Sequence, residues 1–229
     1  MSSRGLAILG MHRSGTSMLA GTLRASGVYF GEVLDHKFAG NPTGLQEAPA
    51  ILFMQEDLLQ KNGGAWHSPP GDVKWERMHL AVRDLFIESR REYALWGFKD
   101  PRTLITLDGW FEACPDMLCM GIFRHPSEVA MSIHRRNEFA LDYCFEIWRA
   151  YNERLLRLSE ARTSPLMEFV AEGDHMLAAI ERCMSVLGLE LSDEARTVFD
   201  TGHRHYERPD IAVPDNCQAL YDTLLERAE

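Results

Sequence analysis

The chain has 229 residues, of which 45% are hydrophobic and 25% are charged, which suits one globular α/β domain with a sizeable core. Its formal net charge of −10 argues against a general nucleic-acid binder, because such proteins usually present a basic face. No stretch approaches the roughly 20 apolar residues of a membrane span, and the N-terminal apolar run is too short for a signal-peptide core. We therefore expect a single domain over residues 1–229 that acts in the cytoplasm.

The first predicted element is an apolar run at residues 6–9, which is typical of a buried parallel strand. The chain then turns at Gly10 and continues with Leu19 and Leu23 four residues apart, a spacing that predicts a helix. Strand, tight turn and helix N-terminus together form an anion site, since the first N–H groups of a helix have no partner within it. This stretch therefore predicts a phosphate-binding loop.

The loop departs from the P-loop pattern G-x-x-x-x-G-K-[ST] at the lysine. Gly10 and Gly15 occupy the glycine positions, but Thr16 stands in place of lysine, and a cation is present earlier as Arg13. The plain structural alternative is a strand-to-helix turn that needs glycine and a Ser/Thr cap. The departure indicates an anion other than a nucleoside triphosphate.

Residues 35–47 are rich in turn formers and predict a loop beside this site. A helix is expected from Glu47 onward, because apolar residues recur at three- and four-residue intervals through Leu58. Glu47 has two interpretations: a carboxylate that stabilises the start of a helix, or the general base of a reaction.

A second loop, residues 61–72, carries Trp66 and His67, which either line an acceptor pocket or only cover the core. Residues 74–92 then predict an amphipathic helix whose charged residues face solvent. The apolar positions expected on its inner face are Met78, Val82 and Leu85.

Two more apolar runs, residues 95–98 and 117–123, predict parallel strands. The first is followed by Lys99-Asp-Pro-Arg102, and the second by Arg124-His-Pro. Ligands of open α/β sheets bind outside the carboxyl ends of strands, so these charged groups are expected to share the crevice of the phosphate loop. Thr103 or Asp100 also has a plain interpretation as the N-cap of the following helix. A Mg²⁺-binding carboxylate often follows such a strand in triphosphate enzymes, whereas an arginine follows it here.

The C-terminal third predicts scaffold: a long helix with a stripe from Trp148 to Leu158, a last strand at 165–170 and another amphipathic helix ending near Gly188. Residues 201–209 form a polar, basic loop. Its H-x-H spacing lacks a further ligand, which disfavours a metal site. The loop either closes over nucleotide phosphates or is solvated surface.

Several motifs resemble those of sulfotransferases. Arg13-Ser-Gly-Thr-Ser17 resembles their 5′-phosphosulfate-binding loop, and Arg124 followed eight residues later by Ser132 resembles their 3′-phosphate-binding motif. The runs Asn41-Pro-x-Gly-x-x-Glu47 and Lys99-Asp-Pro-Arg102 are similar to motifs of bacterial members. The resemblance spans about residues 4–190.

This resemblance implies a P-loop NTPase-like three-layer sandwich with a central, mainly parallel sheet. It implies transfer of a sulfuryl group from 3′-phosphoadenosine 5′-phosphosulfate (PAPS), leaving 3′-phosphoadenosine 5′-phosphate (PAP), with no metal required. The acceptor is expected to be a hydroxyl or amine on a small molecule, glycan or lipid. The alternatives are a P-loop small-molecule kinase and a non-catalytic nucleotide-binding relative.

The resemblance also implies roles for individual residues. The catalytic residues are expected to be Arg13, Lys99 and Glu47, with Arg102 as a further cation. Where many cytosolic sulfotransferases carry a histidine base in a Lys-Thr-His run, this chain has Lys99-Asp-Pro, so Glu47 is the expected base, with Asp100, His36 and His67 as alternatives. The residues expected to bind PAPS are His12, Arg13, Ser14, Gly15, Thr16, Ser17, Arg124 and Ser132.

Overall fold

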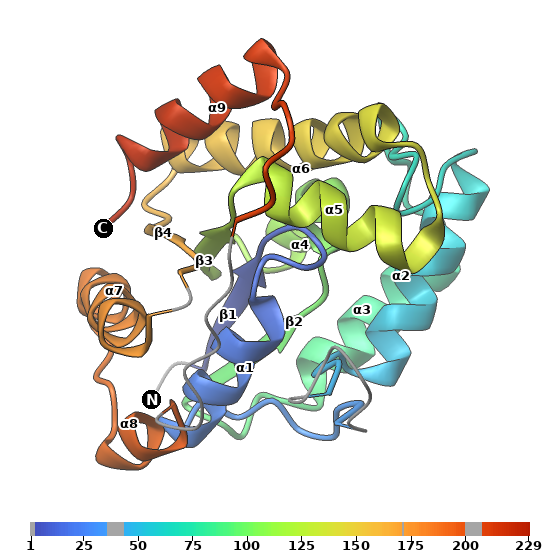
Figure 1. Ribbon diagram of the computed structural model, residues 1–229. Helices are drawn as coiled ribbons and strands as arrows, with labels where there is room; N and C mark the ends of the chain where they lie inside the picture. Colours follow the sequence, from blue (N-terminus) through green and yellow to red (C-terminus); the bar gives the residue numbers. More distant parts are fainter. Residues whose placement is uncertain (1–2, 36–43, 171, 200–207) are drawn as a thin grey trace.

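A parallel four-stranded sheet lies at the centre of the computed structural model, which describes residues 3–35, 44–170, 172–199 and 208–229 (Figure 1). The strand order is β2-β1-β3-β4, and every neighbouring pair is parallel. The strands are β1 (Arg4–Leu9), β2 (Leu95–Lys99), β3 (Leu118–Phe123) and β4 (Leu166–Glu168).

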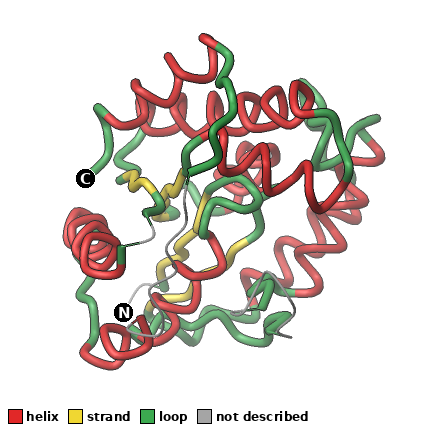
Figure 2. The backbone as a smooth tube through the Cα atoms, in the orientation of Figure 1, coloured by secondary structure: helices red, strands yellow, loops and turns green. Residues whose placement is uncertain are grey.

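Helices surround this sheet in the described part of the chain (Figures 1 and 2). Their bounds are α1 (Thr16–Ala25), α2 (Pro49–Lys61), α3 (Arg77–Glu88), α4 (Thr103–Ala113), α5 (Pro126–Asn137), α6 (Leu141–Ala161), α7 (Gly173–Val186), α8 (Asp193–Phe199) and α9 (Asp215–Leu225). None of the helices that the structure describes is long and apolar enough to cross a membrane.

Alternate side chains of β1 face two separate cores. Leu6 and Ile8 pack with residues of α1 and α7, whereas Ala7 and Leu9 pack with residues of α2, α4 and α6. Strands that are buried on both faces read as continuous apolar runs, which is why this pattern was visible in the sequence. The three-layer α/β arrangement expected from the resemblance is confirmed.

The predicted strands at 6–9, 95–98 and 117–123 are confirmed, and the last strand is shorter than the predicted 165–170. Each parallel strand ends at the same edge of the sheet, so residues 10–15, 99–102 and 124–125 meet there. This edge carries the predicted site.

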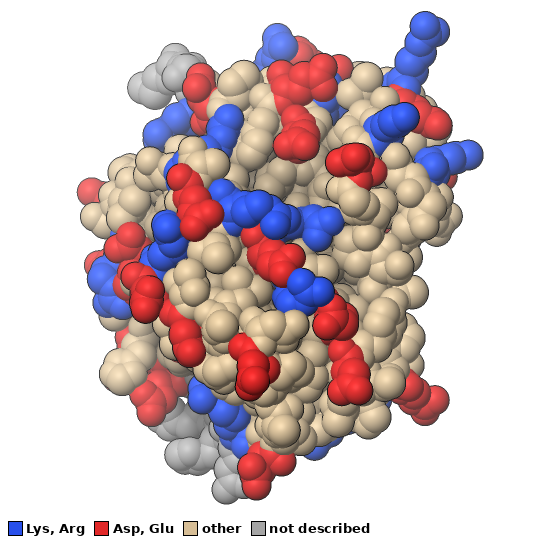
Figure 3. All heavy atoms as spheres, turned by 90° about the horizontal axis from the view of Figure 1, so that it is seen from above, with Lys and Arg blue, Asp and Glu red and all other residues tan. Residues whose placement is uncertain are grey.

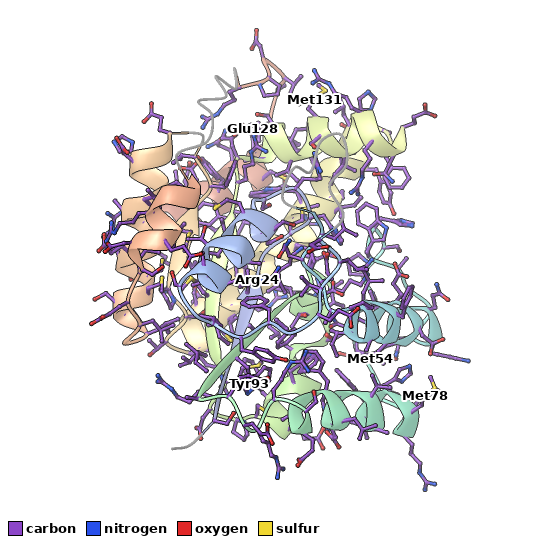
Figure 4. All side chains as sticks on the ribbon, turned by 90° about the horizontal axis from the view of Figure 1, so that it is seen from below. Arg24, Met54, Met78, Tyr93, Glu128 and Met131 are labelled. Carbon is purple, nitrogen blue, oxygen red and sulfur yellow. The ribbon has the colours of Figure 1, made fainter. Side chains whose placement is uncertain are left out.

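The predicted inner face of α3 is wrong at Met78 and Leu85, whereas Val82 packs partly buried against the core. Met78 and Leu85 are 57% and 70% exposed, and Figure 4 shows Met78 at the outer edge of the molecule. The buried face instead carries Phe86 and two polar side chains, His79 and Arg83. Their burial is tolerated because each is paired: His79 Nε2 lies 2.9 Å from Asp57, and Arg83 donates to the carbonyl of Gly109.

Gly10 follows β1 at a point where the backbone approaches β3 closely. A Cβ atom on Gly10 would collide with the carbonyl oxygen of Ile122. We expect Gly10→Ala to lower the free energy of unfolding by about 1–3 kcal/mol, the usual cost of overpacking, as measured by urea denaturation. Gly21→Ala is the control, because Gly21 lies in α1 with open space around it, and that change is expected to stabilise the protein by up to about 1 kcal/mol. Equal stability of the two variants would contradict the close approach.

Candidate functional site

The loop between β1 and α1 has the geometry of an anion-binding turn. Gly15, at φ 88°, is the N-cap of α1, and Arg13, at φ 69°, also adopts the left-handed region. Within the described chain, no side chain caps α1, and its first turn carries no acidic residue. The first-turn N–H groups and the positive end of the helix dipole are therefore left for a ligand.

Lys99, at the end of β2, joins the loop to Glu47. Its Nζ donates to Ser17 Oγ at 3.1 Å and to Glu47 Oε1 at 2.6 Å, and both charged side chains are almost fully buried. Burial raises the pKa of Glu47 and lowers that of Lys99, while the attraction between the two charges opposes both shifts. Glu47 precedes α2, whose N-cap is Ala48 without a side-chain hydrogen bond, so helix capping does not explain this carboxylate.

Asp100 forms a second buried ion pair at the same strand end. Its Oδ1 accepts hydrogen bonds from the backbone N–H of Arg102 at 2.9 Å and from the guanidinium at 3.0 Å. Arg102 also reaches Glu56 at 2.7 Å. Burial raises the pKa of Asp100, and Arg102 opposes the rise. The N-cap of α4 is Arg102, without a side-chain hydrogen bond, so the helix-cap interpretation of Asp100 is wrong.

The 124–132 region lies against the phosphate loop as the sequence predicted. Arg13 Nε donates to Ser132 Oγ at 2.8 Å, although the residues are 119 apart in the chain. Arg124 forms an ion pair with Glu128 at 2.8 Å, and its Nη1 lies 3.5 Å from the carbonyl oxygen of Arg13. The structure thus brings Arg13, Arg124 and Ser132 to one place, and the contact between Arg13 and Ser132 had no signal in sequence spacing.

His12 lies inside a cluster of cations that favours its neutral imidazole form. Burial lowers its pKa well below the usual value, and the positive charges of Arg102, Arg136, Lys99 and Arg13 lower it further. The ring packs on Trp66, with centroids 4.8 Å apart. A neutral histidine here can exchange hydrogen bonds with a ligand without adding a further positive charge.

Buried polar atoms without a hydrogen-bond partner gather at this site. Buried polar groups are normally paired, so a group of exceptions in one place marks the position of a ligand or water. Among the described residues they include His12 Nε2, Ser14 Oγ, Glu47 Oε2, Asp100 Oδ2 and Arg102 Nε. The set contains both donors and acceptors, which fits a ligand with anionic oxygens and a protonated group.

Trp66 and His67 belong to a cluster that we call the aromatic wall, made of Trp66, His67, Phe139 and Tyr143. Ring centroids of neighbouring members lie 5.2–6.3 Å apart. His67 Nδ1 lies 3.0 Å from the Tyr143 hydroxyl, and Tyr143 Oη lies 2.9 Å from the carbonyl oxygen of His67. The wall adjoins the phosphate loop through the contact of Trp66 with His12.

Two sequence predictions fall partly or wholly outside the described residues. His36 lies in 36–43, and most of the 201–209 loop lies in 200–207. The described residues resume at Arg208, whose guanidinium lies 4.0 Å from Glu168 at the end of β4. Arg208 is therefore at the same edge of the sheet as the site.

Charges of both signs are mixed on the face of the molecule seen from above in Figure 3. Lys and Arg side chains there are interspersed with Asp and Glu. No extended basic surface is visible on this face, in keeping with the acidic composition. The cations of the site are a local concentration within an acidic protein.

No protein-family model matches the chain, and no curated protein matches it in sequence. Solved structures match along almost its whole length. The sulfotransferase domain of the Synechococcus PCC 7002 olefin synthase has a TM-score of 0.62 at 17% identity, covering 98% of this chain and 95% of that one. The sulfotransferase domain from the curacin biosynthetic pathway has a TM-score of 0.63 at 12% identity, covering 100% and 99%.

A sulfotransferase from Mycobacterium avium also matches, with a TM-score of 0.60 at 15% identity, covering 99% of this chain and 76% of that one. At such low identities the likeness concerns the fold. This chain has the P-loop-like α/β fold of bacterial sulfotransferase domains, as its motifs led us to expect.

Proposed function

We propose that the protein is a sulfotransferase that moves a sulfuryl group from PAPS to a hydroxyl or amine of an acceptor. One observation carries the proposal: Lys99 Nζ contacts both Ser17 Oγ at 3.1 Å and Glu47 Oε1 at 2.6 Å. A cation and a carboxylate thus adjoin a helix terminus that no side chain caps in the described chain. Sulfuryl transfer to such an acceptor needs this set of groups: an anion cradle, a cation and a base.

The nucleotide would be held at two places. The first-turn N–H groups of α1, including that of Ser17, and the hydroxyls of Ser14 and Thr16 are donors suited to the phosphosulfate. Ser14 Oγ is a buried atom without a partner in the described chain. The Ser17 hydroxyl donates to the carbonyl oxygen of Leu45 at 3.0 Å, so Ser17 offers its backbone N–H to the ligand. Arg124 and Ser132 are the proposed ligands of the 3′-phosphate. PAPS, when bound, supplies the sulfuryl group to be transferred.

Arg13 and Lys99 would stabilise negative charge on the departing side of the reaction. The hydrogen bond from Arg13 Nε to Ser132 Oγ orients the guanidinium, which is always charged and acts electrostatically. Lys99 carries a buried ammonium group already aligned by Ser17 and Glu47. Preorganised charges of this kind act without reorganisation during the reaction.

Glu47 is the proposed general base. Lys99 binds its Oε1, while Oε2 is buried and has no hydrogen-bond partner among the described residues. Oε2 is therefore available to take the proton of an acceptor hydroxyl. His67 Nδ1 is less suited, because it lies 3.0 Å from the Tyr143 hydroxyl.

The proposed base makes activity depend on pH in a defined direction. Burial raises the pKa of Glu47 above the ordinary value of 4.5, and only the deprotonated form accepts a proton. We expect kcat/KM to fall as pH falls through this raised pKa. A pH profile that stays flat down to the ordinary carboxyl value would contradict the assignment.

The experiment that tests the function compares PAP with ATP in calorimetric titrations and thermal shifts, each with and without Mg²⁺. PAP at a hundredfold excess over its Kd should stabilise the protein by about 2.7 kcal/mol, independently of Mg²⁺. Binding of ATP with Mg²⁺, and not of PAP, would overturn the proposal in favour of a kinase. PAP binding without turnover of PAPS on a broad acceptor panel would indicate a non-catalytic relative.

A further inference from the structure

One face of α5 lies along the proposed site. Glu128, Ser132 and Arg136 are four residues apart, so they lie on the same side of the helix. Glu128 contacts Arg124, and Ser132 contacts Arg13. Arg136 extends this row beyond the residues proposed to bind the nucleotide, and it has no role in the function proposed above.

Arg136 is placed on the aromatic wall. Its Cζ lies 5.1 Å from the centroid of the Trp66 ring, and its Nε donates to Asn137 Oδ1 at 2.7 Å. Within the described chain, no carboxylate lies within salt-bridge distance of this guanidinium. A cation at the C-terminal end of a helix is favoured by the dipole, but the dipole does not explain its position over Trp66.

Two other guanidinium groups lie near Arg136. Desolvation lowers the pKa of Arg136, and the nearby charges of Arg13 and Arg102 lower it further. Arg102 is paired with Asp100 and Glu56, whereas no carboxylate among the described residues pairs with Arg136, so an anion beside Arg136 would be stabilised. The position therefore favours a negatively charged ligand.

This anion is not the 3′-phosphate held by Arg124. Arg124 precedes the first residue of α5, and Arg136 is next to last. From Pro126, the first residue of α5, to Arg136 the helix rises by about 15 Å along its axis. Trp66 links Arg136 to His12 in the phosphate loop, so the anion and the reacting end of the nucleotide adjoin the same ring.

We propose that Arg136 and the aromatic wall form the acceptor subsite, and that the acceptor is a hydroxyl compound with a flat aromatic body and an anionic group such as a carboxylate. The wall provides ring faces for the body, and Arg136 pairs with the anion. The inference rests on the proposed function, since it names the acceptor class of that reaction.

The test uses 6-hydroxy-2-naphthoate and its methyl ester, titrated calorimetrically into the protein saturated with PAP. The wild type is expected to bind the acid at least about tenfold more tightly than the ester, as a charge-assisted hydrogen bond allows. Arg136→Gln should abolish this preference, because it should lower the affinity for the acid and leave the affinity for the ester unchanged. Arg135→Gln is the matched control, because Arg135 is an exposed arginine in the same helical turn, and it should keep the preference.

The outcomes separate the inference from the function on which it rests. Equal affinities for acid and ester in the wild type, no binding of either, or a preference that survives in Arg136→Gln would each overturn the inference while PAP still binds. If PAP itself fails to bind, the proposed function fails and the acceptor subsite falls with it. A thermal melt of each variant checks that the fold is intact.

Discussion

Replacement of Glu47 by glutamine is expected to lower the rate of sulfuryl transfer by about 10²–10⁴-fold, the usual contribution of a general base. The amide keeps the shape of the carboxyl, and its oxygen can still accept from Lys99, which now donates to Oε1 at 2.6 Å. It cannot take a proton from the acceptor. The affinity for PAP should stay close to the wild-type value, because Glu47 is not among the proposed nucleotide ligands.

Glu56→Gln is the matched control for this variant. Glu56 lies in α2 close to Glu47 in sequence and pairs with Arg102 at 2.7 Å, but its side chain is 40% exposed. Arg102 keeps its ion pair with Asp100 at 3.0 Å when Glu56 is neutralised, so turnover should remain near normal. Kinetics with saturating PAPS measures the effect on turnover, and calorimetry with PAP measures the effect on nucleotide affinity. Near-normal turnover of Glu47→Gln would exclude Glu47 as the base.

The strands and the phosphate loop could be predicted because their signals are local. Apolar runs of four to seven residues marked the strands, the first followed by the glycine turn with Arg13 and the next two directly by Lys99 and Arg124. The rule that parallel strands present ligands at their carboxyl ends then grouped these three cations before any contact was known. This rule did not single out Glu47, which was a candidate base because its motif is similar to one of bacterial sulfotransferases. That Glu47 and Lys99 form a buried pair, 52 residues apart, needed the fold.

The errors came from positions where tertiary packing overrides periodicity. The inner face of α3 carries His79 and Arg83, which pattern reading assigns to solvent, because their hydrogen bonds to Asp57 and Gly109 offset the cost of burial. Helix α9 was not predicted. Its buried residues Cys217, Tyr221 and Leu224 are spaced four and three apart, so the helical periodicity was present in the sequence although no helix was predicted there.

The aromatic wall shows a third limit of sequence analysis. Trp66 and His67 were recognised as candidate pocket residues, but Phe139 and Tyr143 come from the connection between α5 and α6 and the start of α6. Nothing in their local sequence marks them. Arg136 carried a usable signal, since it lies four residues beyond Ser132 on the same helical face.

Replacement of Arg124 by alanine is expected to weaken PAP binding by about 10- to 100-fold, the value of a lost charge-assisted hydrogen bond. The decisive comparison is with AMP, which has the 5′-phosphate and adenosine but no 3′-phosphate. If Arg124 holds the 3′-phosphate, its loss should lower the affinity for PAP and leave the affinity for AMP nearly unchanged. Calorimetric titration of both nucleotides into both proteins gives the four affinities.

Loss of Arg124 also breaks its 2.8 Å ion pair with Glu128 and its contact with the carbonyl oxygen of Arg13, so the loop itself could shift. A disturbed loop weakens PAP and AMP together, because both place a phosphate on the N-terminus of α1. Glu128→Gln separates the causes, since it removes the ion pair but keeps the guanidinium, and it should hold PAP at least as tightly as the wild type. An equal loss of affinity for PAP and AMP in Arg124→Ala would therefore mean that Arg124 supports the loop and that another residue binds the 3′-phosphate.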